Sequence, residues 1–200
     1  MKLTDRFDAA LRYAFRLHRT QTRKVTEVPY ISHLLAVAAL VLEAGGDEDE
    51  AIAALLHDAV EDQGGAATRA EIAKRFGPRV TAIVDECTDS DATPKPPWKA
   101  RKLAYLAHLA EASPAARRIS AADKLHNVRS LTSDYRVLGE QLWQRFSGGR
   151  EGTLWYYRAV ADALAAADRS PLVEELQRAL AALEQLVNSP GQESNAGGQA

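Results

Sequence analysis

Residues 51–62 read Ala51-Ile52-Ala53-Ala54-Leu55-Leu56-His57-Asp58-Ala59-Val60-Glu61-Asp62, so that an unbroken apolar run leads into a cluster of ionisable residues. The apolar run has no polar face and predicts a buried helix. Because residues four apart lie one above the other on a helix, His57 is expected to lie toward Glu61 and Asp58 toward Asp62. Buried charge needs a compensating partner, and a divalent cation would provide one. The alternative is a helix end that reaches solvent, although carboxylates at that end oppose the helix dipole.

Two further polar residues lie where the pattern predicts core. His33 belongs to a strongly apolar helix that follows Pro29, and Asp123 belongs to a segment whose inward positions are 121, 125 and 128. Either residue alone is explained by a hydrogen bond or an ion pair in the core. Together with His57 and Asp58 they make a nitrogen and oxygen ligand set suited to Mn, Fe, Zn or Mg.

The order His33, His57-Asp58, Asp123 is the H…HD…D pattern of the HD-domain metal-dependent phosphohydrolases. Over roughly residues 5–165 the chain closely resembles the hydrolase domain of RelA/SpoT-type alarmone enzymes, in the segments Arg23-Lys24, His57 to Asp62 (HDxxED) and Ala122 to Asn127 (ADKLHN). Those domains use manganese to remove the 3′-pyrophosphate from guanosine tetra- and pentaphosphate. The resemblance implies that His33, His57, Asp58 and Asp123 are the metal ligands and that Mn²⁺ is the cofactor.

The resemblance also implies roles for residues around the metal. Glu61 and Asp62 would orient or deprotonate the attacking water, or else support the neighbouring ligands. Asn127 lies one helical turn after Asp123, so it would face the same cavity and could hold a sugar hydroxyl or a phosphate. By resemblance, the residues that would hold the nucleotide are Arg23, Lys24, Arg150 and Tyr157. For the last two, the spacing differs from the spacing in the family.

Basic residues gather in two places, near the end of the first helix and after a Pro-rich loop. The clusters are Arg16, Arg19, Arg23 and Lys24, and Lys95, Lys99, Arg101 and Lys102. A solvated surface explains either cluster, but two clusters flanking a metal site suit a substrate with several phosphates. Lys95 and Lys102 are therefore candidate substrate-binding residues.

The apolar periodicity is helical through nearly all of the sequence and predicts an all-α fold, which the resemblance narrows to a compact multi-helix HD-domain bundle. Prolines are expected to open helices at Pro29, Pro78, Pro114 and Pro171. Asp47 is expected to cap a helix that continues through Glu61 and Asp62. The polar loop at 88–97 is expected to be mobile and to influence specificity.

Length and composition favour a single domain. The chain has 200 residues with 46% hydrophobic content, enough for one core, and leaves no room for the synthetase and regulatory domains of the long alarmone enzymes. We expect one hydrolase domain over residues 1–188 and a disordered tail over 189–200, whose composition is polar and rich in Gly.

Charge and composition also limit the partners. A net charge of −2 argues against bulk binding to nucleic acid. The single cysteine, Cys87, the lack of a signal-peptide pattern and the lack of a membrane-spanning apolar run predict a cytoplasmic protein. The apolar stripe of the last helix would allow a homo-oligomer but does not indicate one.

The substrate remains open between related classes. Leu34 follows His33 where the long alarmone enzymes have Pro, and stacking of Arg23 on a base would discriminate weakly between purines. Both guanosine and adenosine alarmones, (p)ppGpp and (p)ppApp, are therefore candidates. The alternatives are an HD-type 5′-nucleotidase, or another nucleotide phosphohydrolase, and a non-catalytic nucleotide-sensing scaffold.

Overall fold

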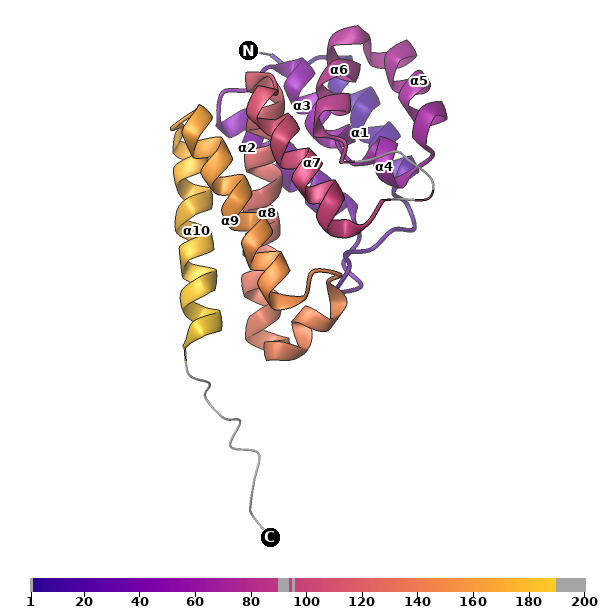
Figure 1. Cartoon of the computed structure of the whole chain (residues 1–200). Coiled ribbons are helices and arrows are strands. Elements are labelled where there is room, and N and C mark those ends of the chain that lie inside the picture. The colour runs from indigo at the N-terminus through magenta and orange to yellow at the C-terminus, as the bar shows by residue number, and fades with distance from the viewer. Residues whose placement is uncertain (1, 90–93, 95, 190–200) are drawn as a thin grey trace.

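A computed structural model of the chain describes residues 2–89, 94 and 96–189 (Figure 1), and within these ranges the fold is all-α, as the periodicity predicts. The helices are α1 (Asp5–Leu17), α2 (Ile31–Glu43), α3 (Glu48–Leu56), α4 (Ala59–Asp62), α5 (Gly65–Phe76), α6 (Pro78–Cys87), α7 (Trp98–Glu111), α8 (Pro114–Leu138), the 3₁₀ helix η1 (Gly139–Arg145), α9 (Gly149–Ala167) and α10 (Pro171–Asn188). The described residues form no strand, only an isolated antiparallel bridge between Thr22 and Pro29.

Several helix starts follow from side-chain caps that the sequence carries. The Asp47 carboxylate accepts a hydrogen bond from the Glu50 N–H at 3.0 Å and caps α3. Ser113 caps α8 by accepting from the Ala116 N–H at 3.2 Å, and Pro114 follows it. These caps confirm the predicted starts of α3 and α8.

The expectation of one helix from Asp47 through Asp62 is wrong, because the chain turns at His57 and Asp58. α3 ends at Leu56 and α4 begins at Ala59. Neighbours on a continuous helix point about 100° apart. The turn instead brings His57 Nε2 within 3.0 Å of Asp58 Oδ2, so that the pair faces a single point.

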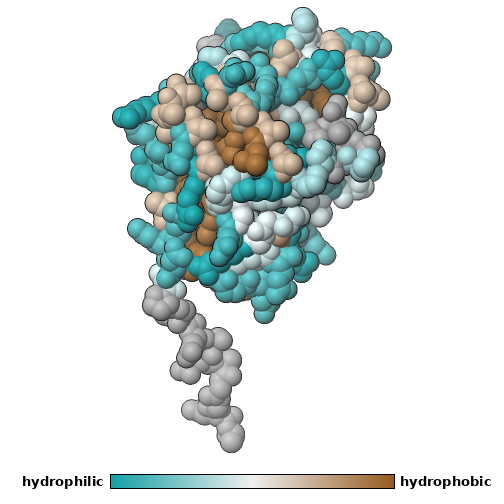
Figure 2. Space-filling view, in the orientation of Figure 1, coloured by the Kyte–Doolittle hydropathy of each residue, from teal (hydrophilic) through white to brown (hydrophobic). Residues whose placement is uncertain are grey.

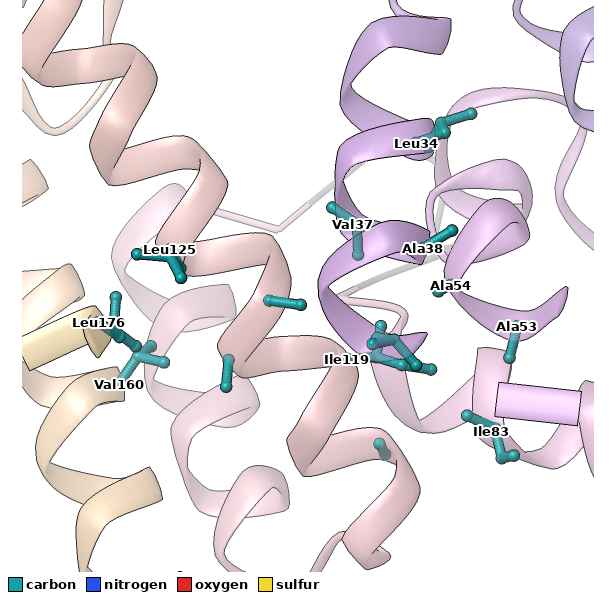
Figure 3. Packing of buried hydrophobic residues seen from close by; sticks show 14 of the residues in the cluster. Leu34, Val37, Ala38, Ala53, Ala54, Ile83, Ile119, Leu125, Val160 and Leu176 are labelled. Carbon is teal, nitrogen blue, oxygen red and sulfur yellow. The ribbon is translucent and has the colours of Figure 1, made fainter. Parts of the chain in front are cut away.

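The long helix α8 is the centre of the packing and contacts α2, α3, α6, α9 and α10. Figure 3 shows Leu125 of α8 facing Val160 and Leu176, from α9 and α10, while Ile119 faces the side on which α2 lies. All four of these side chains are buried. Asp123, on the same helix, is therefore held from both sides by rigid elements.

The face drawn in Figure 2 is mainly hydrophilic, with an apolar area over the region that α7 occupies in Figure 1. Leu103, on α7, is among the exposed apolar side chains. Across the part of the chain that the structure describes, no helix has the length and apolar character needed to cross a membrane.

Candidate metal centre and active site

The four residues predicted to bind metal converge from three parts of the chain. His33 comes from α2, His57 and Asp58 from the turn between α3 and α4, and Asp123 from α8. His33 Nε2 lies 3.2 Å from Asp123 Oδ1 and 3.7 Å from Asp58 Oδ2. His57 Nε2 lies 3.9 Å from Asp123 Oδ1. Both imidazoles and Asp123 are buried, so their polar atoms face one another with little exposure to solvent.

The hydrogen bonds of His57 show that this cluster is suited to a cation. His57 Nδ1 donates to the Ala54 carbonyl at 2.8 Å, so Nε2 is the ring nitrogen that faces the Asp58 carboxylate. Nε2 is buried and has no hydrogen-bond partner. Burial lowers the pKa of His57, but Asp58 and Asp123 outweigh burial and raise it to about 9. With this pKa, His57 carries a proton on Nε2 at neutral pH, and a divalent cation bound among these atoms would replace it.

A further histidine, which has no separate signal in the sequence pattern, fixes the orientation of His33. His33 Nδ1 lies 2.8 Å from Nδ1 of His126, on α8. Burial and the neighbouring His33 lower the pKa of His126 to about 4, so His126 is neutral and can accept the His33 proton. His33 Nε2 is then free to bind a metal ion.

The two acidic residues after the HD pair do not share one location. Glu61 lines the cavity beside the ligand cluster, 3.8 Å from a guanidinium nitrogen of Arg101. Asp62 is exposed and accepts a hydrogen bond from Gln21 Nε2 at 2.9 Å. Among this pair, only Glu61 is placed to contact a substrate in the cavity.

A cavity of about 230 Å³ opens beside Asp58 and Asp123 and is lined by lysines as well as carboxylates. Lys24, Lys102 and Lys124 all line it. Burial, followed by the charge of Lys102, lowers the pKa of Lys24, and burial together with Lys124 lowers the pKa of Lys102 although Asp89 opposes this. Lysines that repel one another in a partly desolvated space favour a ligand with several negative charges.

Aromatic side chains form much of the remaining wall. They are Tyr30, Trp98, Tyr105, Phe146, Tyr156 and Tyr157, with Thr153 among them. Trp98 reaches the wall because Gly148 and Gly152 have no side chain. A Cβ on these glycines would lie 2.7 Å and 3.2 Å from Trp98 Cη2. Aromatic faces beside lysines provide places where a nucleotide can stack.

A second cavity of about 180 Å³ adjoins the first, and both are lined by Lys24, Tyr30, Asn127, Phe146 and Tyr157. Arg23 lines only the second cavity, and its Nη2 donates to Asn127 Oδ1 at 2.6 Å. Asn127 Nδ2 in turn donates to Asp123 Oδ1 at 2.5 Å. A short chain of hydrogen bonds thus joins Asp123, one of the four predicted ligands, to the second cavity.

The structure brings most of the predicted substrate residues together but leaves Arg150 elsewhere. Arg23, Lys24, Lys102, Asn127 and Tyr157 all line one or both cavities. Arg150 lines neither, and its guanidinium donates to the Val187 carbonyl at 2.9 Å and to Asn188 Oδ1 at 2.8 Å. Lys95 lies outside the described residues.

Two cavity residues were missed although the sequence carried a signal for each. Thr153 lies four residues before Tyr157 on α9, which puts both on one face. Lys124 follows Asp123 directly, and its Nζ pairs with Asp123 Oδ2. Loop residues such as Ser147 have no periodic signal, so the sequence could not place them.

Comparison with known proteins agrees with this geometry. The profile of the HD domain matches residues 10–154, and the chain therefore belongs to the HD-domain family. More particularly, it is homologous to the enzymes named guanosine-3′,5′-bis(diphosphate) 3′-pyrophosphohydrolase MESH1. Identity to the Xenopus tropicalis protein is 42% over 125 residues, covering 61% of this chain and 67% of that protein. Identity to the human protein is 39% over 122 residues, covering 60% of this chain and 65% of that protein. The chain thus spans about two thirds of the length of these relatives.

A longer relative and a solved structure extend the comparison. The GTP pyrophosphokinase rsh of Brucella melitensis is 34% identical over 167 residues, which are 82% of this chain and 21% of that protein. A metazoan ortholog of SpoT, described as hydrolysing ppGpp, superposes with a TM-score of 0.76 at 31% identity, covering 91% of this chain and 97% of that chain. The fold of this chain is therefore that of the HD-domain hydrolases.

Proposed function

We propose that this protein is a metal-dependent hydrolase that removes the 3′-pyrophosphate of guanosine tetra- and pentaphosphate, giving GDP or GTP and pyrophosphate. The observation that carries the proposal is a cluster of two histidines and two aspartates, of which Asp58 alone is partly exposed, that opens onto a cavity lined by three lysines. The MESH1 relatives are named for this reaction. We take residues 1–188 to be the hydrolase domain.

His33, His57, Asp58 and Asp123 would hold the metal ion, and we infer manganese from the resemblance to alarmone hydrolases. A divalent ion bound there supplies positive charge that offsets the charge on the phosphoryl oxygens and makes a water molecule nucleophilic near neutral pH. Donors that come from two helices and a short turn between helices are held without long flexible loops, so the geometry of the site is fixed before substrate binds.

The acidic residues around the four proposed ligands would have different roles in hydrolysis. Apart from the proposed ligands Asp58 and Asp123, the acidic side chains among the described residues of the cavity wall are Glu61 and Asp89. We assign to Glu61 the role of accepting a proton from the attacking water. Asp89 does not compete for this role, because its Oδ2 accepts from Lys102 at 2.8 Å. Asp62 supports the site from outside through Gln21.

The phosphates and the nucleoside would occupy different cavities. Lys24, Lys102 and Lys124 surround the first cavity and would hold the two phosphoryl groups that leave. Lys24 Nζ also lies 4.9 Å from the centre of the Phe146 ring, where the two cavities meet. This junction would receive the ribose, and the second cavity would receive the base. A nucleoside monophosphate would bring only one phosphate to the three lysines that line this cavity, which favours the alarmone over a 5′-nucleotidase substrate.

The proposal is tested by product release from a panel of substrates. Purified protein, stripped with a chelator and resupplied with Mn²⁺, is offered ppGpp, ppApp and 5′-nucleoside monophosphates, and pyrophosphate and phosphate are measured separately. Asp58→Asn should abolish release, whereas Asp162→Asn, a matched change at an exposed position on α9, should not change it. Phosphate from the monophosphates alone would establish a nucleotidase instead, and no release from any substrate would favour the non-catalytic scaffold.

A further inference from the structure

The second cavity combines apolar walls with a single acidic side chain. Val25, Leu131 and Phe146 contribute apolar surface, and Asp134 is the one acidic residue among its described lining residues. Burial raises the pKa of Asp134, although Arg23 opposes the shift. No described residue donates a hydrogen bond to this carboxylate, so it is partly desolvated and still has its acceptors available.

Asp134 also lies on the same face of α8 as Asp123, one of the four proposed metal ligands. Asp123, Asn127, Leu131 and Asp134 follow one another at intervals of four, four and three residues along α8, so they share one face of the helix. Eleven residues of helix rise about 16 Å. Since helical side chains lean toward the N-terminus, the Asp134 carboxylate leans back toward Asn127. This spacing fits a nucleoside that extends from the phosphate cavity into the second cavity.

The two purines present opposite groups to a carboxylate at that position. The Watson–Crick edge of guanine carries two adjacent donors, N1–H and the 2-amino group, which match the two oxygens of a carboxylate. Adenine has a lone pair at N1 and only hydrogen at C2, so the same carboxylate would face a lone pair. A site with a desolvated acceptor rejects a ligand that lacks the donor more strongly than an apolar pocket rejects a change of size.

We propose that Asp134 is the residue that selects guanine over adenine, by accepting hydrogen bonds from N1–H and the 2-amino group of the base bound in the second cavity. The inference rests on the proposed 3′-pyrophosphohydrolase function and deepens it by naming the base. A bidentate pair of this kind discriminates by 1–3 kcal/mol, so kcat/KM for ppGpp should exceed that for ppApp by roughly 10- to 100-fold.

The test compares guanosine, inosine and adenosine 3′-pyrophosphates with the metal-loaded wild type and with Asp134→Asn. Inosine keeps N1–H and lacks the 2-amino group, so wild-type kcat/KM should fall in the order guanosine, inosine, adenosine. Asp134→Asn should reduce the guanosine to adenosine ratio by at least roughly tenfold, because a carboxamide can donate to adenine N1. Asp162→Asn, with the same change of charge outside both cavities, should keep the wild-type ratio.

Three results would overturn the inference. Equal kcat/KM for the three bases in the wild type would show that the site does not read the base edge, whether or not the variant folds. An Asp134→Asn protein that loses activity equally toward all three would show that Asp134 only maintains the structure, for example through Arg23. Pyrophosphate release from none of the three would overturn the proposed function and the inference with it, whereas equal release would leave the proposed function standing.

Discussion

The Tyr30 hydroxyl donates a hydrogen bond to Asp58 Oδ2 at 2.5 Å, and this oxygen is also the one nearest His57 Nε2. Burial and the charge of Asp58 raise the pKa of Tyr30, so the phenol remains a donor throughout the physiological range. Tyr30 therefore fixes the Asp58 carboxylate in the orientation that faces both histidines, a role that its place beside the His33 helix did not reveal.

We expect Tyr30→Phe to weaken Mn²⁺ binding by about 10-fold or more, because the carboxylate of Asp58 loses the partner that orients it. Tyr135→Phe is the matched control, since the Tyr135 hydroxyl donates to Glu140 at 2.7 Å in an exposed position. Isothermal titration calorimetry of metal into both variants measures the difference. Equal Mn²⁺ affinities in the two variants would contradict the role of Tyr30 in orienting Asp58.

The hydrogen bond between His33 and His126 leads to a second expectation. His126→Ala should lower metal affinity by about 10- to 100-fold, because the ring of His33 would no longer be held with Nε2 toward the carboxylates. His126→Asn, which can still accept from His33 Nδ1, should recover part of the loss. His108→Ala, at an exposed position on α7, serves as the control. Unchanged affinity in His126→Ala would contradict the orienting role.

The different locations of Glu61 and Asp62 predict unequal effects. Glu61→Gln should lower kcat by about 10²- to 10⁴-fold while metal binding stays close to that of the wild type, because the carboxylate lies in the cavity wall. Asp62→Asn should cost less than about tenfold, since this side chain is exposed and bonds to Gln21. Steady-state kinetics with metal titration distinguish the two. A larger loss in Asp62→Asn would reverse the assignment.

Arg150 should affect stability and leave catalysis unchanged. Its hydrogen bonds to the Val187 carbonyl and Asn188 anchor the end of α10, so Arg150→Ala should lower the free energy of unfolding by about 1 kcal/mol, a value reduced for the partial exposure of the guanidinium. Lys102→Met should instead lower kcat/KM, because Lys102 lines the phosphate cavity. Urea unfolding and kinetics on both variants test this contrast. A fall in kcat/KM for Arg150→Ala would contradict this expectation and would indicate that Arg150 contributes to substrate binding.

The sequence could predict the features that depend on local chemistry. Ser113 followed by Pro114 sets the start of α8 by a cap and a fixed φ, and both signals lie within a few residues. The four proposed ligand residues could be selected because a polar side chain in an apolar pattern needs a partner. Both arguments use information that the sequence contains: the identity of neighbouring residues, and the burial that the spacing of apolar residues indicates.

Other features depend on contacts between distant segments and could not be read from the pattern. The turn at His57 and Asp58 interrupts a sequence that is helical in character, and the two side chains there contact Tyr30, His33 and Asp123, which lie far away in the sequence. Arg150 and Tyr157 both lie on α9. Tertiary packing places Arg150 against the end of α10 and Tyr157 in the cavity wall, and no local signal in the sequence distinguishes the two. Such distinctions require the structure.

The most direct test follows pyrophosphate release from ppGpp as Mn²⁺ is added in fractions of an equivalent to chelator-stripped protein. The wild type should be inactive at the start, gain activity with each addition and saturate near one equivalent, and Asp58→Asn should stay inactive throughout. Pyrophosphate release by the stripped wild type, or equal release by Asp58→Asn, would contradict a hydrolase built on the His33, His57, Asp58 and Asp123 cluster.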